Sequence, residues 1–232
     1  MHISVIEAIK HAAASNNSRP EIKYIDSIEL ERDESKLRVL DELDGVVIPG
    51  GFGAKGVEGK IMAIKYCREN NIPILGICYG FQLMVVEYAR SVLGLDGANT
   101  TEVDGKTRYP VITLLPDQIE KLKRGEYGAT MRLGGQLVLI KKGSLANRLY
   151  GRDRVVERFR HRYEVNPKYV SLFEDSGLRF TGESVDGIKQ VGELSASRHR
   201  YFIGSQYHPE FTSRPLRPNP LFNGLIRAAL NV

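Results

Sequence analysis

The sequence has little of several features that would mark a particular class of protein. Only two of its 232 residues are cysteines, Cys67 and Cys78, and their spacing matches no zinc-binding motif. One pair cannot build a disulfide framework in a chain this long, so we expect two reduced thiols. No apolar run approaches the roughly 20 residues of a membrane helix, and the N-terminus lacks a signal-peptide pattern. We therefore expect a cytoplasmic protein with no membrane partner and no metal site.

Two further absences concern nucleotides and nucleic acids. The G-x-x-x-x-G-K-[ST] phosphate loop is missing, because Gly59-Lys60 is followed by Ile61 and Ala54 occupies the first glycine position. The net charge is +5, but the 33 basic residues are spread along the chain among 28 acidic ones. Nucleic-acid binders usually gather such charge on one face, so we expect no nucleic-acid partner.

The first two-thirds of the chain shows alternating helix and strand patterns. The spacing of apolar residues predicts helices over 3–14, 35–41, 57–70 and 79–92, and strands over 21–26, 45–48 and 72–77. This alternation is typical of an α/β fold with a mostly parallel central sheet and helices on both faces. Such a fold normally begins with a strand, whereas this chain opens almost directly into a helix.

The remaining third predicts a small antiparallel part. We expect a hairpin over 129–142 with its turn at Gly134-Gly135. Further strands are expected near 153–160, 178–182, 190–195 and 201–205, and a closing helix over 221–230. Because the chain contains no internal repeat and no linker, residues 1–232 are expected to form a single domain.

The stretch IPILGICYGFQ carries the most informative pattern. A buried strand runs into Gly76-Ile77-Cys78-Tyr79-Gly80, which is the G-x-S-x-G nucleophile elbow with cysteine in the serine position. The glycines permit the strained turn that lifts the thiol above the sheet. A helix N-terminus there favours thiolate over thiol, and the Tyr79 N–H is placed to help form an oxyanion hole. A small buried cysteine between a strand and a helix would give the same local pattern, so the elbow alone does not decide.

A catalytic cysteine needs a histidine nearby, and His208 fits best among the five histidines. It follows a short apolar strand, and Pro209 keeps the segment from becoming helical. Glu210 can then turn its carboxylate onto the imidazole, as the third member of a triad does. Cys67, by contrast, lies on the apolar stripe of a helix, where core packing is expected.

Together, G-I-C-Y-G and Q-Y-H-P-E-F make this sequence resemble the class I (triad) glutamine amidotransferases. The segments VIPGGFGAKGVEGK, ANTTEV, TMRLGG, RFRHRYEVNP and QYHPEFTSRPLRPNPLF resemble the glutaminase domains of the CTP synthase family, over essentially the whole chain. The resemblance implies a flavodoxin-like fold. It also implies hydrolysis of L-glutamine to glutamate and ammonia through a Cys–His–Glu triad and a γ-glutamyl thioester.

The resemblance also implies roles in substrate binding. In the family, the N–H of Gly50 joins that of Tyr79 in the oxyanion hole. Glu102 falls where the family binds the α-ammonium group of glutamine, and Arg162 where it binds near the α-carboxylate. The remaining residues assigned to the glutamine pocket belong to the Pro-Gly-Gly loop and the elbow helix: Gly51, Gly80, Phe81 and Gln82.

Partners follow from the same resemblance. The ammonia is expected to pass to a CTP-synthase-type synthetase domain, which aminates UTP with ATP and Mg²⁺. We recognise no such domain in this sequence, so the chain alone is not expected to make CTP or to need a cofactor. GTP is expected as an allosteric activator, with Phe52 offering its ring, and a homo-oligomer is a further expectation. On a strand, Arg158, Arg160 and Arg162 would share one face, with one of them reaching the substrate.

Two other interpretations stay open. A related cysteine α/β hydrolase, a γ-glutamyl hydrolase or a DJ-1/PfpI-like protein, would share the elbow. DJ-1/PfpI-like proteins typically place histidine after the nucleophile, where this chain has Tyr79, and R-H-R-Y-E-V-N is not expected in γ-glutamyl hydrolases. A catalytically silent regulatory module is the second alternative, against which Cys78, His208 and Glu210 argue. The usual family elbow reads G-I-C-L-G-M-Q, so Tyr79 is a departure that we expect to affect the pocket or the ammonia exit.

Overall fold

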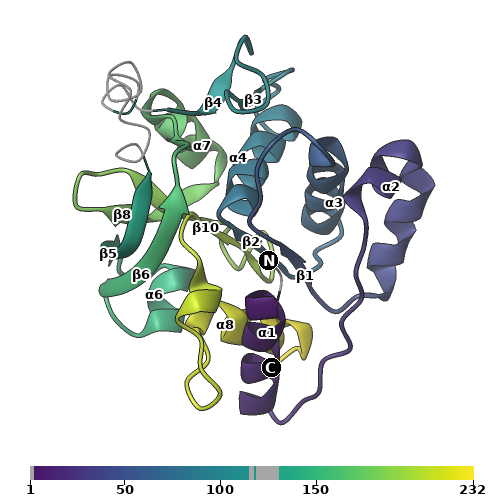
Figure 1. Ribbon diagram of the computed structural model, residues 1–232, viewed down its shortest axis with the longest axis vertical. Helices are drawn as coiled ribbons and strands as arrows, with labels where there is room; N and C mark the ends of the chain where they lie inside the picture. Colours follow the sequence, from purple (N-terminus) through teal and green to yellow (C-terminus); the bar gives the residue numbers. More distant parts are fainter. Residues whose placement is uncertain (1–2, 115–117, 119–130) are drawn as a thin grey trace.

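The computed structural model describes residues 3–114, 118 and 131–232, which are organised around a seven-stranded sheet (Figure 1). In order across the sheet, the strands are β1 (Val46–Ile48), β2 (Ile74–Ile77), β10 (Phe202–Ser205), β9 (Lys189–Glu193), β8 (Arg179–Ser184), β5 (Arg132–Ile140) and β6 (Arg154–His161). The β1–β2 and β2–β10 pairs are parallel, and all pairs beyond β10 are antiparallel. A smaller sheet contains β3 (Asn99–Thr100), β4 (Pro110–Thr113) and β7 (Glu164–Val165). The predicted α/β class is confirmed, but the larger sheet is mixed and not mostly parallel, because its parallel pairing is confined to β1, β2 and β10.

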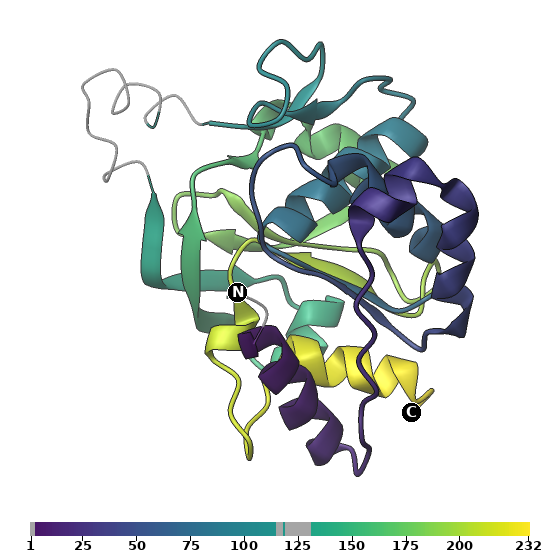
Figure 2. The ribbon, with the colours of Figure 1, turned by 45° about the vertical axis from the view of Figure 1, so that its right-hand side comes forward.

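Helices cover both faces of the parallel strands (Figure 2). One face carries α2 (Ser27–Arg32), α3 (Val57–Glu69) and α4 (Tyr79–Ser91), and the other carries α1 (Ile3–Ser15), α6 (Leu145–Tyr150) and α8 (Pro220–Ala229). The remaining described helices are η1 (Glu34–Glu42), η3 (Pro167–Tyr169), α7 (Val170–Ser176) and η4 (Pro209–Phe211). Because β2 is buried between both layers, all of its residues are shielded from water, as its apolar run predicts.

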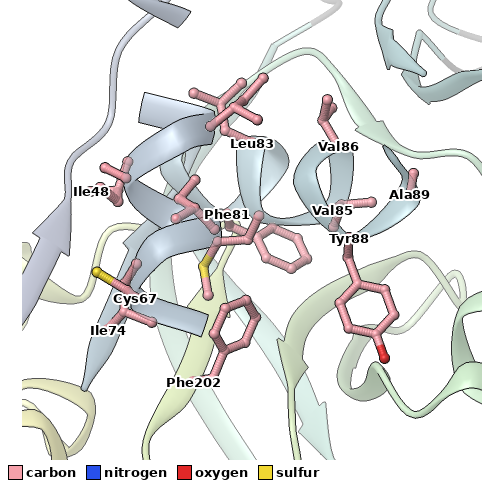
Figure 3. Packing of buried hydrophobic residues seen from close by; sticks show 14 of the residues in the cluster. Ile48, Cys67, Ile74, Phe81, Leu83, Val85, Val86, Tyr88, Ala89 and Phe202 are labelled. Carbon is pink, nitrogen blue, oxygen red and sulfur yellow. The ribbon is translucent and has the colours of Figure 1, made fainter. Parts of the chain in front are cut away.

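The core between the sheet and the helices α3 and α4 contains Cys67 (Figure 3). Cys67 is fully buried on α3, in the same cluster as Ile74 and Phe202. Burial raises the pKa of its thiol to about 12, so the thiol stays protonated and unreactive. The predicted packing role of Cys67 is therefore confirmed.

Two predicted strand features are wrong. Residues 21–26 form no strand, because no described strand pairs with them and most of their side chains lie at the surface. Gly134-Gly135 is not a hairpin turn, since β5 continues through both glycines and pairs with Phe159 and Arg158 of β6. Gly134 has a φ of 76° that bends the strand without reversing it. Residues 129 and 130 of the predicted hairpin lie outside the described residues.

The N-terminal part of the described chain begins with α1, which packs on α8. No strand precedes β1 within residues 3–114, and β1 forms one edge of the larger sheet. In the ranges that the structure describes, no helix combines the length and the apolar character needed to cross a membrane.

Candidate active site

The turn between β2 and α4 holds Cys78 in an unusual backbone conformation. Cys78 has φ 51° and ψ −103°, directly before the first residue of α4. A positive φ is rare for a residue with a side chain and persists only when its surroundings enforce it. Here the Cys78 N–H donates to the carbonyl of Ser205 at 2.7 Å, which ties the turn to the end of β10. The strand–turn–helix geometry expected of a nucleophile elbow is therefore present.

The glycines on either side of Cys78 are required by close packing. A Cβ atom at Gly80 would lie 2.1 Å from the carbonyl oxygen of Ile48, and one at Gly76 would lie 2.3 Å from the sulfur of Met84. Both distances are far below van der Waals contact, and the first involves rigid backbone. The helix that begins after Cys78 can thus approach β1 only because Gly80 has no side chain.

His208 and Glu210 reach the same point from the end of β10. Nδ1 of His208 lies 2.8 Å from Oε1 of Glu210, and the His208 N–H donates to the carbonyl of Arg158. Burial acts to lower the pKa of His208, but hydrogen bonds and charge interactions with Cys78 and Glu210 outweigh it and raise this pKa to about 10. Since Nδ1 is bound to the carboxylate, Nε2 is the nitrogen left to face the thiol.

Phe211 restricts the imidazole further. Its ring stacks on the ring of His208 with centroids 5.2 Å apart and an interplanar angle of 20°. An aromatic face beside a protonated imidazole is favourable because the ring quadrupole attracts a cation. The sequence argument did not single out Phe211, although it directly follows the His-Pro-Glu motif.

The Pro-Gly-Gly loop after β1 passes directly over this pair. A Cβ atom at Gly50 would lie 3.0 Å from Cε1 of His208 and 3.6 Å from Cβ of Cys78. The backbone at Gly50 therefore lies close enough to both groups to contact a substrate between them. The Tyr79 hydroxyl donates to the carbonyl of Gly53 at 2.5 Å, so the departure from the family elbow ties this loop to α4.

Glu102 and Arg162 bring opposite charges to the site. Oε1 of Glu102 accepts the N–H of Gly53 at 3.1 Å. Burial raises the pKa of Glu102, opposed by that N–H and by the charge of Arg162. Nε of Arg162 is buried and has no hydrogen-bond partner among the described residues. A buried guanidinium nitrogen without a partner is unusual, and it suits the binding of an anionic group.

Gln82 links α4 to the chain beyond β6. Its Nε2 donates to the carbonyl of Tyr163 at 2.9 Å and to Oε1 of Gln206 at 3.1 Å. Gln206 in turn places its Nε2 3.7 Å from Sγ of Cys78, and the carbonyl of Arg160 lies 3.8 Å from the same sulfur. Sequence reasoning missed Gln206, although it stands two residues before His208 in the same motif.

Two of the predicted positions, Phe81 and Arg162, differ in detail from the expectation. The side chain of Phe81 is buried against the sheet, 2.6 Å from where a Cβ of Gly204 would lie, so only its backbone can face the site. Arg158 and Arg160 are exposed on one face of β6, whereas Arg162 lies beyond the end of that strand. Phe52 is 76% exposed. Gly51 lies beside Tyr79, since a Cβ atom at Gly51 would lie 3.4 Å from Cδ1 of Tyr79.

Comparisons with known proteins identify a family that matches nearly the whole chain. The family model "Glutamine amidotransferase class-I" matches residues 1–228. The CTP synthase of Thermococcus kodakarensis is 53% identical over 230 residues, covering 98% of this chain and 42% of the relative. The CTP synthase of Pyrococcus abyssi is 52% identical with the same coverage. The chain therefore spans about two-fifths of the length of these relatives.

A solved structure is similar over nearly the whole chain. It is the glutaminase domain of the Trypanosoma brucei CTPS with bound acivicin, with a TM-score of 0.90 and 34% identity. The match covers 99% of this chain and 88% of that one. Among the described residues, no group of three or more His, Cys, Asp or Glu side chains could hold a metal ion.

Proposed function

This chain belongs to the class I glutamine amidotransferases, and from that premise we propose that it hydrolyses L-glutamine to glutamate and ammonia with Cys78, His208 and Glu210. The observation that carries the proposal is the conformation and setting of Cys78. It has a positive φ at the N-terminus of α4, and its thiol helps to raise the pKa of His208, whose Nδ1 lies 2.8 Å from Oε1 of Glu210. This is the arrangement by which a thiol is activated for nucleophilic attack.

The proposed reaction is an acyl transfer in two steps. The Cys78 thiolate attacks the side-chain amide carbon of glutamine, and the N–H groups of Gly50 and Tyr79 stabilise the resulting oxyanion. The His208 imidazolium gives its proton to the leaving nitrogen, which departs as ammonia and leaves a γ-glutamyl thioester. His208 then takes a proton from water, the hydroxide attacks the thioester, and glutamate and the thiolate are released. The raised pKa of His208 keeps it protonated for the first step at neutral pH.

Recognition of glutamine is assigned to the charged pair in the pocket. The Glu102 carboxylate is suited to the α-ammonium group, and the partner-free nitrogen of Arg162 is suited to the α-carboxylate. Gly51, Gly80, Phe81 and Gln82 complete the pocket through backbone groups and the Gln82 amide. A substrate lacking either charged α-group is expected to bind poorly, because a charge in the pocket would be left without its partner.

We further propose that the ammonia serves amination of UTP to CTP by a synthetase domain of the CTP synthase type. This rests on relatives that bear that name and extend well beyond the matched region. ATP and Mg²⁺ would act in that domain, and GTP would act as an activator of the glutaminase reaction. A homo-oligomer, a cytoplasmic location and a single domain over residues 1–232 stay predictions.

Glutamate release from L-glutamine tests the proposal. The wild-type chain and the Cys78→Ala variant are assayed with and without GTP, and a CTP-synthase-type synthetase domain is added in a parallel series. Release by the wild type that disappears in the variant is the expected result. Absence of release in every arm, including the one with the synthetase domain, would contradict the catalytic assignment.

A further inference from the structure

A buried ionic cluster lies where the chain leaves β6 and enters β7. Nε2 of His161 lies 2.8 Å from Oε1 of Glu164, and Nε of Arg132 forms an ion pair with the same oxygen at 2.6 Å. The side chains of His161 and Glu164 are 2% and 0% exposed. Arg132 also pairs with Asp186, which accepts a hydrogen bond from the Ser184 hydroxyl. The proposed mechanism does not use these charged groups.

The cluster closes a turn that connects the two sheets. His161 is the last residue of β6 in the larger sheet, and Glu164 is the first residue of β7 in the smaller one. The side-chain contact between them therefore joins both ends of the turn. Arg132 is opposite His161 in the β5–β6 ladder, so it fixes the cluster to the larger sheet as well.

The two residues inside this turn are Arg162 and Tyr163, and both reach the active site. The carbonyl of Tyr163 accepts the Nε2 hydrogen of Gln82, one turn into the helix that follows Cys78. Arg162 carries the buried nitrogen without a partner. Just before the turn, the carbonyl of Arg160 lies 3.8 Å from Sγ of Cys78. A rotation of the turn would move the Arg162 guanidinium together with the Tyr163 carbonyl that binds Gln82.

We propose that Glu164, with His161 and Arg132, is a positioning group that sets the direction of Arg162 and so governs the affinity for the amino-acid end of glutamine. This rests on the proposed glutaminase function. A buried ion pair is weak as a source of stability, because apolar residues of similar volume often serve as well. The His161–Glu164 hydrogen bond and the Arg132–Glu164 ion pair nevertheless hold the turn in one orientation, which is what a two-point contact with a substrate requires.

The proposed positioning role predicts a change in glutamine binding without a change in the chemical steps. Cys78, His208 and Glu210 are held by β2, α4 and β10, and none of them bonds to Glu164. Loss of the Glu164 charge should therefore raise the KM for glutamine while leaving kcat within a few-fold of the wild type. The expected rise is on the order of tenfold to a hundredfold, as for loss of a well-aligned hydrogen bond between charged groups.

Glu164→Gln is the test variant and Glu193→Gln is its matched control. Glu193 is also a buried carboxylate, 2% exposed, and accepts hydrogen bonds from the N–H groups of Leu145 and Ala146 and from the Thr181 hydroxyl. It makes no bond to the turn or to the triad. Both variants lose one buried charge, so general destabilisation should affect them alike.

Two further readouts make the comparison independent of turnover. Labelling of Cys78 by the glutamine analogue diazo-oxo-norleucine requires the amino-acid pocket, whereas labelling by iodoacetamide requires only a reactive thiol. We expect Glu164→Gln to slow the first reaction and to leave the second at the wild-type rate. If Glu164→Gln does not fold, Arg132→Lys keeps the charge, removes the planar contact and is expected to raise KM more mildly.

The possible outcomes distinguish failure of the positioning role of Glu164 from failure of the proposed glutaminase function. An active wild type with an unchanged KM in folded Glu164→Gln overturns the positioning role alone. The same holds if Glu193→Gln raises KM equally. A wild type that neither turns over glutamine nor reacts with the analogue, even with a synthetase domain present, overturns the proposed function itself.

Discussion

Cys67 and Cys78 lie before and after the same strand, β2, and each has a histidine as a close neighbour. Nε2 of His199 bonds to the backbone carbonyl of Cys67 at 3.1 Å and not to its thiol. The thiol of Cys78, in contrast, is among the groups that raise the pKa of His208. The pKa of His199 is lowered, chiefly by burial, while the pKa of His208 is raised to about 10. Both cysteines are buried, so exposure alone does not separate them. The difference comes from backbone conformation and from what each imidazole contacts.

The largest predicted difference is in glutamine turnover, between the variants that remove one thiol or the other. Cys78→Ala should lower glutamine turnover by at least about 10⁴-fold, as loss of a triad nucleophile does. Cys67→Ala should leave kcat and KM unchanged and lower the free energy of unfolding by about 1 kcal/mol, the cost of a small core cavity. Steady-state kinetics and urea denaturation of both variants measure the contrast. Equal loss of activity in the two would remove the distinction between the cysteines.

Substitution of Glu210 tests whether catalysis depends on the carboxylate that binds the His208 imidazole. Glu210→Gln should lower kcat by about 10²- to 10⁴-fold, because the imidazole loses the carboxylate that orients it and stabilises its charge. The hydrogen bond and charge of Glu210 help to raise the pKa of His208, so the high-pH limit of activity should move to lower pH. A pH–rate profile measures the shift. Glu183→Gln, at a partly buried ion pair with Lys189, is the control and should leave the profile in place.

Substitution of Gly80 tests whether the fold depends on the close approach of α4 to β1. Gly80→Ala would place a Cβ 2.1 Å from the Ile48 carbonyl oxygen, and it should cost about 2–4 kcal/mol of folding free energy. Gly105→Ala is the control, since its nearest neighbour is 3.9 Å away. Thermal or urea denaturation compares the two. Equal stability of both variants would mean that α4 can shift away from β1 without penalty.

The smallest predicted effect is the pH dependence of folding stability caused by His199, the histidine beside Cys67. Because the folded pKa of His199 lies below its ordinary 6.5, the unfolded chain binds its proton more readily. Its contribution to stability is therefore complete above pH 6.5 and is lost as the pH falls below that value. His208 behaves oppositely: its contribution is complete below 6.5 and is lost as the pH rises through about 10.

Urea midpoints at about pH 7.5 and about pH 5.5 test this sign in the wild type and in His199→Asn. The wild type should lose more stability on acidification than the variant, because the variant has no imidazole to protonate at that position. An equal loss in both proteins would show that His199 does not couple folding to pH.

Local sequence patterns predicted the parts of the molecule that depend on short stretches of chain. The turn at Cys78 needs two glycines within five residues, and the contact between His208 and Glu210 spans two residues, so both could be inferred without a fold. The helices α3 and α4 followed from their apolar spacing in the same way.

Features that depend on distant partners could not be predicted in this way. Residues 21–26 have a strand pattern, but no described strand pairs with them. Gly134-Gly135 has the composition of a turn, and only the pairing of β5 with β6 shows that the strand continues through it. Gln206 acquires its position near Cys78 only through the β2–β10 pairing. The contact of His161 and Glu164 with Arg132 needs the β5–β6 register, which no local pattern specifies.

The most direct test of the account is to locate the adduct formed by diazo-oxo-norleucine in the wild-type chain by peptide mass spectrometry. The account predicts a single adduct on Cys78, none on Cys67, and slower labelling when L-glutamine is present. An adduct on Cys67, or labelling of Cys78 that glutamine does not slow, would contradict the assignment of Cys78 as the nucleophile of a glutamine-binding site.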